Sequence, residues 1–424
     1  MGQGNGKAGA DFNEEVNLNQ FELLRVVGKG AFGKVRIVKR RDNNKLYALK
    51  YISKEECIRI DAERNILRER SMLEELDHPL VCNLRFAFQD EDYMYMVMDL
   101  MMGGDLRFHL NRKAFTEDAI RFWIAELACA IRYLHSKDVV HRDIKPDNVL
   151  LDEKGHVHLT DFNIATHIRP DRPLSSRSGT CAYMAPEVFK SSGYGITVDW
   201  WSLGILFYEC VYGKRPFESN NQEELKKMIV RAPINYPDMD PPVSPACISA
   251  IQGFLERDIS RRLGCGPNGF ALIQYHPFFR PLDFSLLEAK SFDPVFCPPP
   301  DKVNFDATLD LEEILLEEEP LEARRGRRHK RHRDPEQEAR YLLIEERFKP
   351  FDYMVFERYK GWIDPVTRCV GDPPEWVKPA AVELENQRER ASQEQLVGSR
   401  RESLGGSATN VVIGNGFSGI AGVG

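Results

Sequence analysis

The segment from His141 to Asn148 brings a guanidinium, a carboxylate, an ammonium group and an amide together within eight residues. These side chains suit phosphoryl transfer, which needs cations to offset the moving charge and oxygen ligands for a metal ion. Apolar residues flank the segment at 139–140 and 149–151, so a loop held between two short buried strands is expected. Such a loop suits catalysis because it holds its side chains in place.

A glycine-rich hairpin is expected nearer the N-terminus, between strands predicted at 21–28 and 34–38. Glycines let backbone N–H groups approach phosphates because no Cβ intervenes, and an aromatic tip would exclude water. The matching residues are Gly28, Lys29, Gly30, Ala31, Phe32, Gly33 and Val35. A helix after the same spacing would instead indicate a dinucleotide site, and a merely flexible hairpin is the structural alternative.

Lys50 lies in a third predicted strand, 46–52, where it needs an acidic partner, since a lone lysine in an apolar strand is ordinarily an edge residue. Apolar residues at helical spacing predict a helix over 61–76, and Glu69 on that helix is the expected partner. Three neighbouring acids compete for the role: Glu63, Glu74 and Glu75.

A nucleotide pocket is expected where the buried strand 93–98 ends. Backbone groups of Asp99 to Met101 could read adenine edges, Met98 would limit the depth of the pocket, and Asp105 could accept from ribose hydroxyls.

Asp161 ends another short predicted strand, 18 residues after Asp143. This is the place for a second Mg²⁺ ligand beside Asn148. Each motif alone has an ordinary structural explanation, but all of them in this order indicate a phosphoryl-transfer site.

Taken together, the motifs resemble those of the protein kinase superfamily over residues 21–279. Gly179-Thr180 looks like part of an activation segment, and Glu187 with Arg262 matches a buried structural ion pair. The resemblance implies an α+β, bilobal protein kinase fold. It places a small antiparallel sheet and one helix in an N-lobe over 21–101, and a mostly helical C-lobe over 102–279.

Lys145 near Asp143, together with Thr180, is similar to serine/threonine kinases. The resemblance implies transfer of the ATP γ-phosphate to Ser or Thr hydroxyls of protein substrates, with Asp143 as the proton acceptor and Lys145 neutralising charge. Lys50, fixed by Glu69, would position the phosphates of ATP. The Mg²⁺ ligands would be Asn148 and Asp161.

The chain after the catalytic domain resembles the C-terminal extension of the AGC kinases, assigned to 280–362. Residues 298–300 and 304–306 carry this resemblance, and Phe348 and Phe351 resemble a hydrophobic motif that docks on the small lobe. Many relatives have Ser or Thr where this chain has Asp352, so docking is expected without phosphorylation.

Asn163 is the clearest departure, because most kinases have glycine there. Asp161-Phe-Asn163, with His156-Val-His158 before it, is similar to the YANK branch of the AGC kinases. Asparagine tolerates a positive φ, so metal binding by Asp161 is expected to survive and Asn163 to restrain inactive flips. The alternative is a catalytically weak scaffold with a kinase fold.

Three carboxylates match positions where basophilic AGC kinases hold substrate arginines: Asp105, Asp147 and Glu209. They predict a preference for basic residues before the target, although ribose binding by Asp105 and helix packing by Glu209 are structural alternatives. Ser176 matches a regulatory phosphosite, where Arg142 could pair with an added phosphate, and an ordinary loop serine is its alternative.

Composition narrows the remaining classes. A net charge of -7 over 424 residues provides no overall basic field, so no specific nucleic acid is expected. Nine scattered cysteines, an odd number, indicate a reducing compartment. Without an apolar run of about 18 residues or a signal core, the protein is expected to be neither membrane-spanning nor secreted, with the cytoplasm or nucleus as the default compartment. A monomer is also expected.

Polar, glycine-rich composition predicts disorder over 1–20 and largely over 363–424. Gly2 is a candidate for acylation, although Gly6 stands where the acylation pattern wants Ser or Thr. The basic run Arg324–Arg333 has three possible roles: nuclear import, contact with anionic lipid at a membrane, or a solvated linker.

Overall fold

The computed structural model describes residues 15–29, 33–169, 172–190, 193–299, 304, 321 and 334–353, apart from the side chain of Lys29. All of these residues lie in the first of two compact units, which spans Met1–Val377. Several predicted features fall outside the described residues: Gly30, Ala31 and Phe32 of the hairpin, the basic run Arg324–Arg333 and the tail 363–424.

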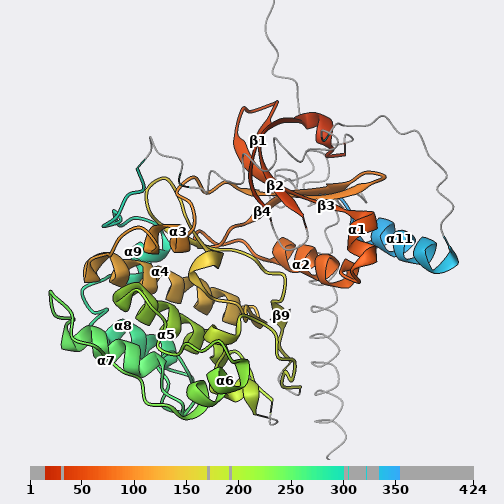
Figure 1. The fold of residues 1–424 in the computed structure, drawn as a ribbon. Coiled ribbons are helices and arrows are strands. Elements are labelled where there is room, and N and C mark those ends of the chain that lie inside the picture. The colour runs from red at the N-terminus through yellow and green to blue at the C-terminus, as the bar shows by residue number, and fades with distance from the viewer. Residues whose placement is uncertain are drawn as a thin grey trace, which may run out of the picture. The chain divides into compact units, whose positions relative to one another are not determined.

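A six-stranded antiparallel sheet forms the smaller lobe, in the order β1-β2-β3-β5-β4-β10 (Figure 1). Its strands are β1 (Phe21–Lys29), β2 (Lys34–Arg40), β3 (Leu46–Ser53), β4 (Leu84–Gln89), β5 (Tyr93–Asp99) and β10 (Phe351–Asp352). Two helices follow β3, namely α1 (Lys54–Arg59) and α2 (Glu63–Glu75).

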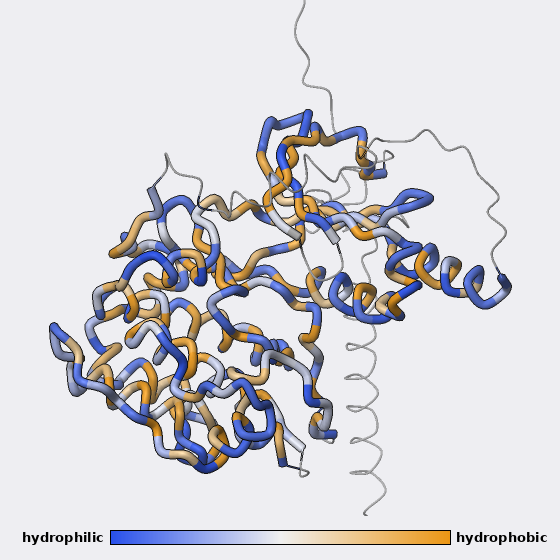
Figure 2. The backbone as a smooth tube through the Cα atoms, in the orientation of Figure 1, coloured by the Kyte–Doolittle hydropathy of each residue, from blue (hydrophilic) through white to orange (hydrophobic). Residues whose placement is uncertain are grey.

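Both faces of this sheet are covered, which explains why its central strands are almost continuously apolar. Successive side chains of a strand point to opposite faces. Along β5, Tyr95 and Val97 belong to one buried cluster, whereas Met94 and Met96 belong to the other, which continues into α2 and the larger lobe. The apolar stretches of the strands and helices are visible along the chain in Figure 2.

Residues 15–20 depart from the predicted N-terminal disorder. Leu18–Gln20 form the 3-10 helix η1, whose first turn is capped by the side chain of Asn17. Val16 and Leu18 are buried in the cluster that covers one face of the sheet. Burial of these two apolar side chains stabilises a segment whose polar composition predicted disorder.

The larger lobe is mostly helical and is built on two long helices, α4 (Glu117–Ser136) and α5 (Thr197–Tyr212), which pack together. The Thr116 side chain caps α4 by accepting from the Ala119 N–H, and Gly213 ends α5 with φ 67°. The remaining helices are α3 (Leu106–Leu110), α6 (Gln222–Arg231), α7 (Pro245–Phe254), α8 (Gly269–Tyr275), α9 (Phe284–Glu288), and the 3-10 helices η2 (Pro146–Asn148), η3 (Cys181–Tyr183) and η4 (Pro186–Phe189). The predicted α+β, two-lobed class is therefore confirmed.

Two small sheets flank the central loop of the larger lobe. β6 (Val139–Val140) pairs with β9 (Thr166–His167), and β7 (Val149–Leu151) pairs with β8 (Val157–Leu159). The polar segment 141–148 thus runs between two short strands, β6 and β7, as its flanking valines predicted.

The end of the described chain returns to the smaller lobe. α11 (Pro335–Arg347) lies against α1 and α2, and β10 extends the sheet by pairing with β4 (Figure 1). Phe348 is fully buried, 5.2 Å from the Arg70 guanidinium, and Arg70 also donates to the Lys349 carbonyl. The Asp352 carboxylate lies 3.6 Å from Arg40. The structure therefore places all three predicted tail residues, Phe348, Phe351 and Asp352, against the smaller lobe.

Truncation of Phe348 tests how much its burial against α2 contributes to the free energy of unfolding. Phe348→Ala is expected to lower the free energy of unfolding by about 3–5 kcal/mol, because it leaves a cavity beside α2. Urea denaturation measures the change. Leu342→Ala on α11 is the matched control, since Leu342 is 55% exposed and its loss should cost less than about 0.5 kcal/mol. Equal effects of the two variants would contradict a buried anchor at Phe348.

Candidate active site

A buried carboxylate on α5 anchors the central loop. Asp199 Oδ2 accepts from the His141 N–H at 3.0 Å and lies 2.9 Å from His135 Nε2, while Oδ1 accepts from the Arg142 N–H at 2.9 Å. Burial acts to raise the pKa of Asp199, but the His135 hydrogen bond and the positive surroundings hold it below its usual value. Arg142 adopts φ 70°, a conformation that these bonds help to hold.

The side chains of Lys145, Thr180 and Asn148 converge on the Asp143 carboxylate. Lys145 Nζ lies 2.6 Å from Oδ2, and the hydroxyl and N–H of Thr180 donate to Oδ1 at 2.7 and 3.0 Å. Lys145 also donates to the Thr180 hydroxyl at 2.9 Å. Burial acts to raise the pKa of Asp143, but the Lys145 and Thr180 contacts outweigh it and keep the pKa below its usual value. The carboxylate is therefore ionised at neutral pH and able to accept a proton.

Gly179 permits this approach of Thr180. It has φ 116°, and a Cβ at this position would meet the Arg142 carbonyl oxygen at 2.4 Å. Only glycine fits such a conformation against backbone without a shift of the segment.

Lys50 and Glu69 form the expected pair, with 2.7 Å between Nζ and Oε1. Both are buried, and burial raises the pKa of Glu69 although the Lys50 charge opposes the shift. The three competing acids have other partners: Glu63 pairs with Arg340, Glu74 with Arg70, and Glu75 with His167. The fold thus removes the ambiguity that the sequence left open at this helix.

Asn163 connects Lys50 to Asp161. Its Oδ1 accepts from Lys50 Nζ at 3.4 Å, and its Nδ2 donates to the Asp161 carboxylate. The positive φ of this segment, 65°, belongs to Asp161, whereas Asn163 is not among the residues with positive φ. The expectation that tolerance of a left-handed backbone matters at Asn163 was therefore wrong, because the unusual conformation lies at Asp161.

The donor atoms suit a hard divalent cation. Asn148 Nδ2 donates to the Asp143 carbonyl at 2.8 Å and to its carboxylate at 3.0 Å, so the amide oxygen of Asn148 is the atom that could bind a metal ion. An amide oxygen and the Asp161 carboxylate are the oxygen ligands that Mg²⁺ prefers. Among the described residues, no cluster of three or more His, Cys, Asp or Glu forms a separate metal site.

The predicted nucleotide residues lie at and after the end of β5. Met98 is partly buried and Met101 is 7% exposed, whereas the Asp99 carboxylate is held by Arg85 through two contacts of 2.7 Å. Asp105 caps α3 by accepting from the Phe108 N–H at 2.7 Å. Burial raises the pKa of Asp105, and ribose binding at this carboxylate stays a prediction.

Arg107 forms ion pairs with two of the three carboxylates that were predicted to bind substrate arginines. This residue was not singled out from the sequence. It lies 2.6 Å from Glu209 and 3.3 Å from Asp147. These partners are 102 and 40 residues away along the chain, so no local pattern reveals the contact.

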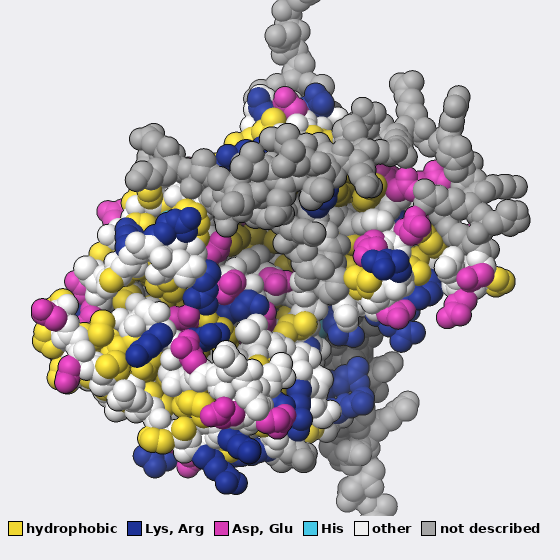
Figure 3. Space-filling model, in the orientation of Figure 1, with side chains coloured by type: hydrophobic (Ala, Val, Ile, Leu, Met, Phe, Trp, Pro, Cys, Tyr) yellow, Lys and Arg dark blue, Asp and Glu magenta, His cyan; other side chains and the backbone are white. Residues whose placement is uncertain are grey.

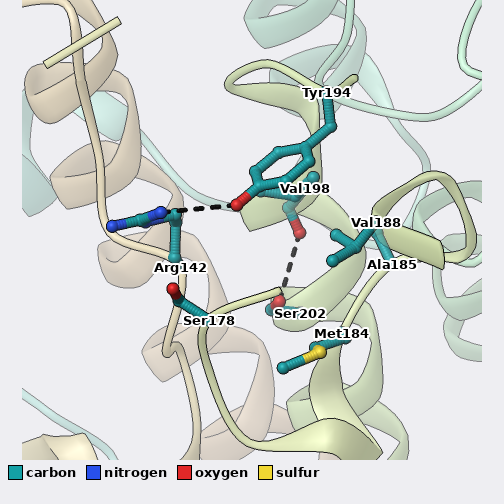
Figure 4. Close-up of a pocket in the computed structure, with 8 residues that line it drawn as sticks. All are labelled: Arg142, Ser178, Met184, Ala185, Val188, Tyr194, Val198 and Ser202. Atoms are coloured by element: carbon teal, nitrogen blue, oxygen red, sulfur yellow. Dashed lines mark hydrogen bonds between the residues drawn. The ribbon is translucent and has the colours of Figure 1, made fainter. Parts of the chain in front are cut away.

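Arg142 also reaches the predicted phosphosite. Its Nη1 donates to the Ser176 hydroxyl at 2.8 Å, and Ser176 is exposed. Figure 4 shows the guanidinium pointing toward the Tyr194 hydroxyl, at 3.4 Å, beside a small pocket. The pocket is lined by Arg142, Ser178, Met184, Ala185, Val188, Tyr194, Val198 and Ser202. Phosphorylation of Ser176 stays a prediction.

Glu187 and Arg262 form the implied buried pair, with contacts of 2.6 and 2.9 Å. Both side chains are buried, and Arg262 also donates to the Thr197 carbonyl at 3.0 Å, which indicates a structural role. No helix among the described residues is long and apolar enough to cross a membrane.

The comparisons with known proteins agree with this geometry. The family model described as protein kinase domain matches residues 21–279. The chain is 42% identical to human serine/threonine-protein kinase 32B over 323 residues, which cover 75% of this chain and 77% of that protein. It is 41% identical to human serine/threonine-protein kinase 32C over 326 residues, with 75% and 66% covered. Serine/threonine-protein kinase Sgk1 of Fundulus heteroclitus is 39% identical over 305 residues, with 70% of each chain covered.

Replacement of Asp199 tests the anchor. Asp199→Asn is expected to lower the free energy of unfolding by roughly 2–3 kcal/mol at pH 7, because a charged acceptor of buried N–H groups is lost. The folded-state pKa of Asp199 lies below its usual value. The wild-type advantage is therefore complete above about pH 4 and is lost as the pH falls through the folded pKa.

Urea denaturation at several pH values measures this difference. Asp138→Asn is the control, since Asp138 is exposed and asparagine accepts its φ of 57°. A pH-independent difference between wild type and Asp199→Asn would contradict the role of the ionised carboxylate.

Proposed function

Since the chain belongs to the protein kinase family, as a serine/threonine kinase of the YANK branch of the AGC group, we propose that the Asp143 cluster carries out its phosphoryl transfer. The observation that carries this proposal is the convergence of Lys145, Thr180 and Asn148 on one ionised carboxylate. ATP is the phosphate donor and protein Ser or Thr hydroxyls are the acceptors.

Asp143 would orient the incoming hydroxyl and accept its proton. Its depressed pKa keeps it ionised, and its contacts with Lys145 and Thr180 hold it in one orientation. Lys145 then lies beside the reacting hydroxyl, where its positive charge would stabilise the phosphoryl group in transit.

Lys50 would hold the phosphates of ATP from the other lobe. Its buried contact with Glu69 fixes the ammonium group, so little reorganisation is needed when the nucleotide binds. We assign Mg²⁺ to Asn148 and Asp161, and the bound ion would offset the charge of the phosphates. The described glycines Gly28 and Gly33 flank the hairpin that would cover them.

A catalytically weak scaffold is the second candidate, and Asn163 is the observation in its favour. The amide lies between Lys50 and Asp161, two residues that the transfer needs. We favour the enzyme because every other chemical residue is present and already paired in the required way.

The compartment and the basic run Arg324–Arg333 stay predictions. Nuclear import and contact with anionic lipid would both use the charge of this run, which lies outside the described residues.

Removal of Asp143 separates the two candidates. Asp143→Ala is expected to lower phosphate transfer by about 10³-fold or more while ATP binding stays nearly intact, because the proton acceptor is lost but the nucleotide contacts are kept. Transfer of radiolabelled phosphate to a degenerate peptide library, with ATP binding measured by calorimetry, checks both parts. Glu153→Gln is the matched control, since Glu153 is an exposed acid in the neighbouring turn. ATP binding without transfer by the wild type would support the scaffold.

Exchange of Asn163 for the common glycine tests its influence. Asn163→Gly removes the contacts with Lys50 and Asp161, so we expect a changed rate, about twofold to tenfold, and a changed profile of ATP-site inhibitors. Steady-state kinetics over a range of Mg²⁺ concentrations measures the effect. Unchanged kinetics together with an unchanged inhibitor profile would show that the amide restrains nothing.

A further inference from the structure

The Arg107 guanidinium is engaged on every nitrogen by groups of its own chain. Nη1 donates to Glu209 Oε1 at 2.6 Å, and Nε and Nη2 donate to Asp147 Oδ2 at 3.3 Å. Nη2 also donates to the Tyr183 hydroxyl at 2.7 Å, which in turn donates to Glu209. The cluster of Arg107, Asp147, Tyr183 and Glu209 is therefore a closed network around one cation.

The network adjoins the place where a substrate must lie. Asp147 belongs to the same loop as Asp143, and Tyr183 follows closely after Thr180, whose hydroxyl and N–H hold the Asp143 carboxylate. A polypeptide that presents a hydroxyl to Asp143 has to pass over this part of the larger lobe. Its side chains would meet the Arg107 cluster beside the reacting residue.

The buried negative charge of the network, on Glu209, is already neutralised by Arg107. The Glu209 side chain is only 7% exposed, and its carboxylate is shared by Arg107 and Tyr183. Burial acts to lower the pKa of Arg107, but the Glu209 hydrogen bond raises it above its usual value, so the cation stays charged. A second cation from a substrate would have to displace Arg107 or lie next to it, and like charges in contact are unfavourable.

We propose that Arg107 takes the place of a substrate arginine and thereby suppresses selection for basic residues by Asp147 and Glu209. The inference rests on the proposed function, because it concerns the peptide bound at the Asp143 site. It also changes the expected selectivity: two of the three carboxylates predicted to read arginine are occupied by the chain itself, and the third, Asp105, caps α3. Arg107 is a specificity-determining residue in this scheme.

The charges around the Arg107 network indicate that selection depends on individual side chains and not on an overall negative potential of the surface. Acidic and basic side chains alternate over the larger lobe on the face shown in Figure 3. Selection of a basic substrate residue would therefore depend on individual carboxylates such as Glu209, and on whether each is available.

A positional scanning peptide library tests the proposal with the full chain. For wild type, arginine over alanine should change kcat/KM by no more than about twofold at each position before the target. For Arg107→Leu, one position should rise to about tenfold in favour of arginine, since a vacated buried carboxylate then binds the substrate cation. Arg112→Leu is the matched control, because Arg112 is an exposed arginine that donates to the Phe108 carbonyl and lies over the Phe108 ring, outside the Arg107 network. This variant should keep the wild-type profile. The same arginine preference in wild type and Arg107→Leu would overturn the proposal.

Arg107→Leu leaves the buried Glu209 carboxylate without its cation and can therefore misfold. Two further variants test the proposal in that case. Glu209→Gln in the presence of Arg107 should change the arginine-to-alanine ratio by less than about twofold, since Arg107 already shields this side chain. Loss of an existing arginine preference by about fivefold or more in Glu209→Gln would overturn the proposal even if Arg107→Leu does not fold. The double variant Arg107→Leu/Glu209→Gln, which restores charge balance, should not gain the tenfold preference.

The outcomes separate this proposal from the proposed function. Failure of the wild type to phosphorylate any peptide, in a preparation that binds ATP, counts against the function and not against the charge balance around Arg107. In that case, binding of arginine-containing and alanine-containing peptides by fluorescence anisotropy gives the same comparison without turnover. Tighter binding of the arginine peptide only to Arg107→Leu supports the proposal, and equal affinity ratios for both proteins overturn it.

Discussion

A buried carboxylate that holds backbone N–H groups is the constraint on which the rest of the site depends. Asp199 projects from the core helix α5 and accepts from the N–H groups of His141 and Arg142. A buried carboxylate is stable only when strong donors surround it. The N–H groups of the loop at 141–148 must therefore stay beside Asp199, which fixes the position of the loop relative to α5. Arg142 continues the connection, because its guanidinium donates to the Ile164 carbonyl and to Ser176. The Arg142 side chain thereby connects the loop at 141–148 to the segment that follows Asp161.

The helix α2 is held in a comparable way from two sides. Glu69 faces Lys50 on the inner side, while Arg70 and its neighbours face the returning tail, where Phe348 is buried. Arg340 on α11 pairs with Glu63 at the start of the same helix. A shift of α2 would separate several buried charges at once, which is energetically costly. The tail and Lys50 therefore contact the same helix, α2, through different side chains.

Two side chains share a further property: each lies between groups that the reaction or its substrate would otherwise engage. Asn163 lies between Lys50 and Asp161, and Arg107 lies between Asp147 and Glu209. Polar groups gathered in a site must be satisfied whether or not a ligand is bound, since an unpaired buried charge is unfavourable. In this chain, internal side chains meet part of that requirement, and a ligand has to compete with them.

The sequence by itself determined the fold class, through the order and spacing of its motifs over 21–279. It also determined the loop at 141–148 with its flanking strands, because these are local features. Only the tertiary structure decided which acid pairs with Lys50. Glu63 and Glu75 pair with residues remote in sequence, whereas Glu74 pairs with Arg70 on the same helix. The tertiary structure also placed the positive φ at Asp161 and brought Arg107 to Glu209. Periodicity and motifs report neighbours along the chain, whereas charge pairing depends on which side chains share a buried space.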